Sequence, residues 1–175
     1  MTIKTIITIL VLSLAVFAQN DWKTKDFDKW DTKDVEAVLN KSDWAVKQGF
    51  KSGSNEITMT VRLRSAMAIR LALVRQLQLE MERKQLSPEE KEAYLKKQNG
   101  IYACPTCTDN FVITISSVST ETKQYDHIYN YYRTTTLEQL RQRIYLQNDK
   151  GEKRELVHFV SPKSPGDEAQ FFFRR

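Results

Sequence analysis

Residues 56–86 read EITMTVRLRSAMAIRLALVRQLQLEMERKQL, and this stretch decides the fold class. Over 56–64, apolar and polar side chains alternate without exception, and this period of two predicts a half-buried β-strand. From Ser65 onward the pattern changes to the helical period, in which Ile69 and Leu73 begin a series of apolar residues four apart. The chain is therefore expected to pass directly from a strand into a helix.

A second helix is expected to follow the first without a strand between them. Ser87 can cap it, Pro88 suits its first position, and glutamates occupy its first turn. Gly100 is the expected stop. Residues 65–99 are therefore predicted to form two consecutive helices.

The last third of the sequence favours strands. Its strand patterns are NFVITISSV at 110–118, RIYLQ at 143–147, ELVHFV at 155–160 and AQFFFRR at 169–175. The second and third are joined across NDKG, with Gly151 at a left-handed position, and TTTLEQL at 134–140 predicts one helical turn. With the strand at 56–64, these segments predict a mainly antiparallel sheet of about four to five strands.

The N-terminal segment is expected to be helical, which makes the whole chain α+β. Asp31 can cap a helix with Asp34 as its capping-box partner, while Trp30 and Val35 occupy the two positions of a hydrophobic staple. Ser42 is a second candidate cap, and we expect a further helical turn in the DWAVKQ segment that follows it.

Three tryptophans, Trp22, Trp30 and Trp44, lie in or beside this segment. Because they flank the caps and the staple, we interpret them as structural anchors that hold the helical segment on the domain. The alternative is a set of exposed rings that bind sugars.

The first eighteen residues predict a signal peptide, residues 1–18. Residues 6–17 form an apolar run that is too short to span a bilayer, and Val16 and Ala18 supply the small residues of a cleavage site. The mature chain would begin at Gln19 and be exported, to the periplasm or the exterior. A retained membrane anchor is the alternative.

Residues 19–175 are long enough for a single α+β domain. The formal charge is +5, and loss of Lys4 with the signal leaves +4. Both signs of charge are interspersed, so we expect no nucleic-acid partner. No transmembrane segment is expected after signal cleavage.

Three motifs resemble a family of exported bacterial proteins of unknown function. They are a tryptophan-bearing helix ending in Ser-x-Trp-Ala (42–45), a Ser-Ala-x-x-x-Arg helix start (65–70) and a late Ala-x-Phe-x-Phe-x-Arg strand (169–175). The resemblance covers most of the mature chain and implies no activity. Members of that family continue past the last strand, so the resemblance implies further β structure beyond residue 175.

The only two cysteines form the motif CPTC, at Cys104 and Cys107. A redox site usually places such a pair after a strand and at a helix N-terminus, which lowers the pKa of the first thiol. Here the expected order is helix, CPTC, then strand. We therefore predict a local structural disulfide worth about 2 kcal/mol, because its loop is short. The alternative is a redox pair in which Cys104 attacks and Cys107 resolves.

Metal binding and acid–base catalysis have weaker support. Only His127 and His158 are available to join the cysteines, and their spacing matches no common zinc site. His127 adjoins Asp126, so an Asp–His dyad is conceivable, while His158 is expected to share a face with Leu156 and Val160 as a buried or edge residue. No metal or other cofactor is expected.

Tyr125, Tyr129 and Tyr132 recur at helical spacing. Core packing is the favoured interpretation and stacking on a sugar the alternative.

Two functions remain open. The first is an exported non-enzymatic domain that binds an unknown protein or envelope component, or is itself a structural part of the envelope or secretome. The second is an extracytoplasmic thiol-disulfide oxidoreductase that uses the CPTC pair. We also expect the AQFFFRR strand to leave one apolar face and an edge uncovered, which would promote self-association.

Overall fold

The computed structural model describes residues 21–52, 55–119 and 129–175. Its helices include α1 (Thr32–Asn40), α2 (Met67–Arg83), α3 (Pro88–Ala103) and α5 (Leu137–Arg141), and residues 129–134 are also helical. Its strands are β1 (Lys41–Ser42), β2 (Ala45–Ser52), β3 (Asn55–Leu63), β4 (Asn110–Ser119), β5 (Tyr145–Gln147), β6 (Lys153–Val160) and β7 (Ala169–Arg174). The chain is therefore α+β, as the sequence predicted.

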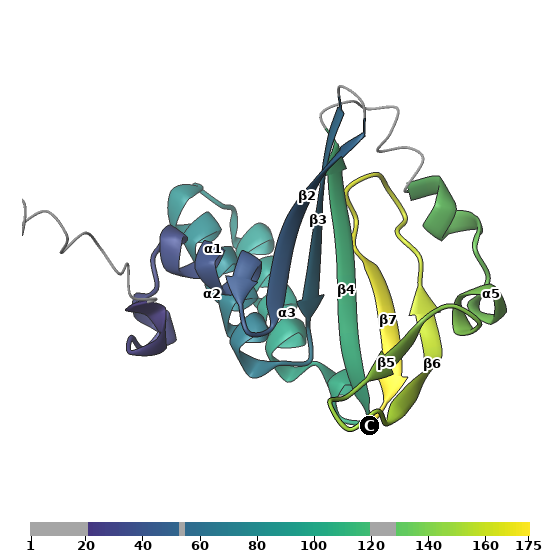
Figure 1. Ribbon diagram of the computed structural model, residues 1–175. Coiled ribbons are helices and arrows are strands. Elements are labelled where there is room, and N and C mark those ends of the chain that lie inside the picture. The colour runs from purple at the N-terminus through teal and green to yellow at the C-terminus, as the bar shows by residue number, and fades with distance from the viewer. Residues whose placement is uncertain (1–20, 53–54, 120–128) are drawn as a thin grey trace, which may run out of the picture.

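The strands form one antiparallel sheet in the order β1-β2-β3-β4-β7-β6-β5. Helices α1, α2 and α3 lie together beside β2 and β3, and α5 lies toward the other end of the sheet, near β6 (Figure 1). All five predicted strands are present. The described part of the sheet has seven strands, more than the four to five expected, because β1 and β2 were not predicted.

The segment after Ser42, predicted to be helical, is a strand instead. The Ser42 hydroxyl donates to the carbonyl of Val38 and accepts from the backbone N–H of Trp44, so it caps the end of α1 and shapes the turn into β2. β2 then pairs with β3 along its whole length, from Ala45 to Ser52. This long ladder outweighs the local helical signal, a common outcome for short segments.

Helix α1 begins as predicted. Asp31 accepts hydrogen bonds from the backbone N–H groups of Lys33 and Asp34, and the Asp34 carboxylate accepts from the backbone of Asp31. This is the capping box, which satisfies N–H groups that the first helical turn leaves unpaired.

The predicted change from strand to helix occurs at Ser65. Its backbone N–H donates to the carbonyl of Val112 and its hydroxyl accepts from the N–H of the same residue. Ser65 therefore continues the pairing of β3 with β4 by one residue while the chain turns into α2.

Helix α3 starts at the predicted capping box, with Ser87 and Glu90, but does not stop at Gly100. It continues to Ala103 and ends where Cys104 takes a left-handed conformation, with φ of 40°. A left-handed residue is the usual way to end a helix, although glycine normally fills the position. Cys104 therefore takes the role that the sequence assigned to Gly100.

Three apolar clusters hold helices and turns on the sheet. The first joins α1 and α2 to the start of β2 and includes Trp30, Leu39 and Ile69. The second packs Leu140 of α5 against Phe171 and Phe173 of β7. The third joins both cysteines to Val112 of β4 and Phe172 of β7, on the opposite face of β7 from the second.

Strand β7 has no free edge, which contradicts the expectation of an exposed C-terminal strand. It pairs with β4 on one side and β6 on the other, and Phe171, Phe172 and Phe173 are all buried. Three consecutive positions of β7 are aromatic, without polar residues between them, because an apolar cluster covers each face of the strand. No helix in the described ranges is long and apolar enough to cross a membrane.

Candidate functional site

The two cysteines lie at disulfide distance from each other, in the turn between α3 and β4. Their Cα atoms are 5.3 Å apart. A 3₁₀ turn, Pro105–Cys107, begins directly after Cys104 and ends with Cys107. Cys104 is 7% exposed and Cys107 is 5% exposed. Both sulfurs are therefore largely closed to solvent and to other thiols.

The disulfide turn also covers one face of the sheet. Both cysteines pack in one cluster with Val112, Phe172 and the partly buried Val157. On the same sheet face, α1 and α2 cover β2 and β3, so the turn extends the covered area across β4 and β7 (Figure 1). Cysteine side chains act here as small hydrophobic groups.

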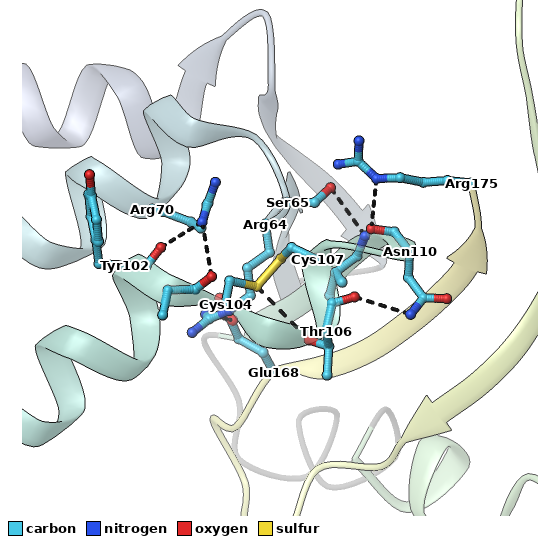
Figure 2. Close-up of a disulfide and its surroundings, with 12 residues drawn as sticks. Arg64, Ser65, Arg70, Tyr102, Cys104, Thr106, Cys107, Asn110, Glu168 and Arg175 are labelled. Atoms are coloured by element: carbon cyan, nitrogen blue, oxygen red, sulfur yellow. Dashed lines mark hydrogen bonds and ion pairs between the residues drawn. A yellow bond between two sulfur atoms is a disulfide. The ribbon is translucent and has the colours of Figure 1, made fainter.

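Two arginines hold the ends of this turn (Figure 2). Arg70 of α2 donates from Nη1 to the carbonyl of Tyr102 at 2.6 Å, next to the end of α3. Arg175 donates from Nε to the carbonyl of Asn110 at 3.4 Å, at the start of β4. Ser65 also binds β4, through Val112, so side chains distant in sequence meet around the disulfide.

This arrangement bears on thiol chemistry in two opposed ways. Cys104 ends α3, and the negative end of a helix disfavours a thiolate. Arg70 brings a guanidinium to the residue pair just before Cys104, and a cation favours a thiolate. This cation comes from α2, 34 positions before Cys104 along the chain, so the residues around the CPTC motif give no sign of it.

The three tryptophans form a packed group. The rings of Trp22 and Trp30 meet edge to face with centroids 5.8 Å apart, and Trp44 lies 6.3 Å from Trp22. Trp30 also donates from its indole nitrogen to the carbonyls of Trp22 and Lys25. Trp22 and Trp30 are buried and Trp44 is half-buried, so the first two offer no open ring face to a sugar.

His158 does not share a face with Leu156, contrary to expectation. A bulge between them breaks the alternation of β6, so that Leu156 is buried while His158 is exposed and contacts Phe172 across the strand pair. His127, Asp126 and Tyr125 lie outside the described residues. In the described ranges, no group of three or more histidine, cysteine or carboxylate side chains is placed to hold a metal ion.

The other two tyrosines have different surroundings. Tyr132 packs in the second cluster against Phe171, with ring centroids 5.7 Å apart, and burial raises its pKa. Tyr129 donates from its hydroxyl to the carbonyl of Lys163 at 2.8 Å.

A positively charged hollow, which sequence reasoning missed, lies at the end of the sheet where α5, β6 and β7 meet. This basic hollow has a volume of about 410 Å³ and is lined by Arg141, Lys153, Arg154, Glu155, Val157, Arg174 and Arg175. Its cations come from three separate elements, and no run of five like charges marks it in the sequence. The pairs Lys153-Arg154 and Arg174-Arg175 are the only local signal.

One apolar face of the sheet is open. Val46 of β2 and Val61 of β3 are paired neighbours that face away from α1 and α2, and Val46 is 56% exposed. Phe50, further along β2, is 45% exposed. Side chains of this kind are normally covered, and large uncovered patches often mark contact surfaces.

Comparisons with models of protein families, with curated proteins and with solved structures found no match for this chain.

Proposed function

We propose that this chain is an exported, non-enzymatic domain that binds a partner or forms part of the cell envelope or secretome. The observation that carries the proposal is the buried pair Cys104 and Cys107, which lies at disulfide distance inside an apolar cluster. Disulfides persist in oxidising compartments and are rare in the cytosol. The signal-like residues 1–18 and the resemblance to exported bacterial proteins point the same way.

The packing of the cysteines supports a structural role over a redox one. A redox cysteine must expose a thiolate to its substrate, whereas a structural cysteine is buried and inert. The two cysteines instead pack in one buried cluster with the core side chains Val112 and Phe172. Reduction would therefore disturb the packing of the disulfide turn on Phe172 of β7, in addition to producing two thiols.

The open apolar face supports the partner-binding part of the proposal. Val46 and Phe50 are too exposed to contribute much to the core, yet both are large apolar residues on one face of β2. A protein partner that covers this face would remove their side chains from water.

Expression of the full chain, with its native N-terminus, in a bacterial host tests whether the protein is exported. We expect mass spectrometry of the exported fraction to show cleavage after Ala18 and no free thiol at Cys104 or Cys107. A cytosolic protein that retains Met1 and carries two reactive thiols would contradict the proposal.

A thiol-disulfide oxidoreductase remains the second candidate, and Arg70 is the observation that favours it. In that case the reduced protein should have a thiol at Cys104 that is already ionised at pH 6, and Arg70→Gln should raise its pKa. The rate of alkylation as a function of pH measures both. A thiol that reacts only near its ordinary pKa of about 8.5, or only in denaturant, would exclude this candidate.

A further inference from the structure

The basic hollow concentrates positive charge that the described protein side chains do not neutralise. Its lining contains five cationic side chains and a single acidic side chain, that of Glu155. Throughout the described ranges, none of the five forms an ion pair within 4.0 Å.

Three arginines elsewhere in the protein behave differently. Arg62 and Arg64 both bind the carboxylate of Glu168, at 2.7 and 3.6 Å, and Arg75 binds Glu82 at 3.0 Å. Arg70, Arg83, Arg133 and Arg143 also form no ion pair within the described ranges. What distinguishes the basic hollow is that four such arginines line one site. Such a group is destabilised by mutual repulsion unless an anion joins it.

Several of these cations are held in place by contacts that leave their charge available. Arg141 donates from Nε to the carbonyl of Leu156 at 2.8 Å, on β6. The guanidinium of Arg175 lies over the ring of Phe111, 4.9 Å from its centroid, and Lys153 lies over Tyr145 at 4.1 Å. Carbonyls and rings position the cations without neutralising them. This lowers the entropy cost of ordering these side chains when a ligand binds.

The chemistry of the lining points to an oxyanion. A guanidinium presents its N–H donors in a planar fork that matches the oxygens of phosphate, and four of the five cations are arginines. The volume of about 410 Å³ lies in the usual range of small-ligand sites.

We propose that the basic hollow binds a phosphate-bearing ligand. The anion is carried either by a free oligophosphate or by the headgroup of an anionic lipid at a membrane surface. This inference goes beyond the proposed function, because it assigns a ligand to a site separate from the apolar face of β2 and β3. It rests on the geometry of the hollow and not on the disulfide.

The first test measures binding of tripolyphosphate to the full chain by calorimetry at constant ionic strength. The double variant Arg154→Gln/Arg174→Gln removes two hollow cations whose side chains make no hydrogen bond to the described residues. We expect its Kd to rise at least about tenfold, since the loss of even one charge-assisted hydrogen bond worth about 1.4 kcal/mol corresponds to a tenfold change.

The matched control is Arg83→Gln/Arg143→Gln, which removes the same charge from two exposed arginines outside the hollow. We expect this control to bind like the parent protein. Equal weakening of both double variants would show a general charge effect and overturn the proposal. Circular dichroism melting checks that each variant is folded. If the double variant is unfolded, the single variant Arg154→Gln replaces it in the binding measurement.

The second test identifies the source of the phosphate. Co-sedimentation with phosphatidylglycerol vesicles, but not with phosphatidylcholine vesicles, and competition by tripolyphosphate would assign the hollow to a lipid headgroup. Binding of tripolyphosphate without vesicle binding would assign it to a free phosphate ligand. Failure of both probes to bind overturns the inference and leaves the export result untouched, because signal cleavage and thiol state are measured separately.

Discussion

Strands β3 and β7 are similar in their apolar content but differ in what covers them. β7 lies between β4 and β6, and Phe172 packs under the disulfide turn while Phe171 and Phe173 pack under α5. Among the described residues, β3 is covered on one face only, by α1 and α2, and there it presents Thr60 and Arg62.

The comparison shows that apolar alternation in a sequence identifies the apolar face of a strand. It does not predict which element, if any, packs on that face. The helix-facing side of β3 is polar because Arg62 binds the carbonyl of Leu39, at the end of α1, and the carboxylate of Glu168. The apolar residues of β3, together with Val46 and Phe50 of β2, face the other way, toward the open side. The covered half of the sheet supplies stability, and the open half leaves apolar surface exposed, which is where the proposed partner would bind.

The largest effect is expected from Phe171→Ala, which tests the covered half. The ring is 1% exposed and lies at the centre of the second cluster, so its loss should lower the free energy of unfolding by about 3 to 5 kcal/mol. The matched control is Phe50→Ala on β2, where the ring is 45% exposed and the expected change is below about 1 kcal/mol. Urea denaturation of both variants measures the difference, and similar losses would break the comparison.

Trp30→Ala tests the helical layer. The ring is 4% exposed and donates to two backbone carbonyls, so we expect a loss of about 3 to 5 kcal/mol if the protein unfolds in one step. Because α1 packs at the β1–β2 end of the sheet while β7 lies inside it, hydrogen exchange should show faster opening of α1 than of β7. A melting curve equal to that of the parent would indicate that the N-terminal segment contributes little to the fold.

The sequence predicted the elements whose signals are local. The capping boxes at Asp31 and Ser87, the strand-to-helix change at Ser65 and the left-handed Gly151 each depend on a few neighbouring residues, and all are present. The strand at 45–52 was missed because its partner, β3, decides its conformation through eight backbone pairs. Periodicity cannot show such pairing within one short segment.

The site was harder to predict than the fold. Cys104 and Cys107 were identified as a pair because their spacing is local, but the covering role of the turn depends on Phe172, 65 positions further along the chain. The basic hollow was missed for the same reason, since α5, β6 and β7 bring Arg141, Arg154 and Arg174 together only in the folded protein. Contacts between distant elements carry this information, and no sequence window contains them.

The double variant Cys104→Ala/Cys107→Ala tests how much the disulfide turn stabilises β7. Loss of so short a loop should cost about 2 kcal/mol by chain entropy, which is less than removal of a core ring. Urea denaturation of the parent with and without reductant should show the same difference. A loss above about 4 kcal/mol would mean that the turn fails to cover Phe172 once the bond is absent.

The smallest effect concerns the helix cap and its dependence on pH. The backbone N–H of Asp34, more than any other group, lowers the pKa of the Asp31 carboxyl below its ordinary value of 3.8. A carboxyl with a lowered pKa in the folded state stabilises the fold fully above the unfolded value, and the stabilisation is lost as the pH falls through the folded pKa.

Asp31→Asn keeps an acceptor but not the charge, so its melting temperature should lie slightly below that of the parent at pH 7, and the gap should close toward pH 2.5. Asp149→Asn, an exposed turn residue outside any helix, is the control and should show no such closing gap. A gap for Asp31→Asn that is the same at both pH values would show that hydrogen bonding alone, without the charge, holds the first turn of α1.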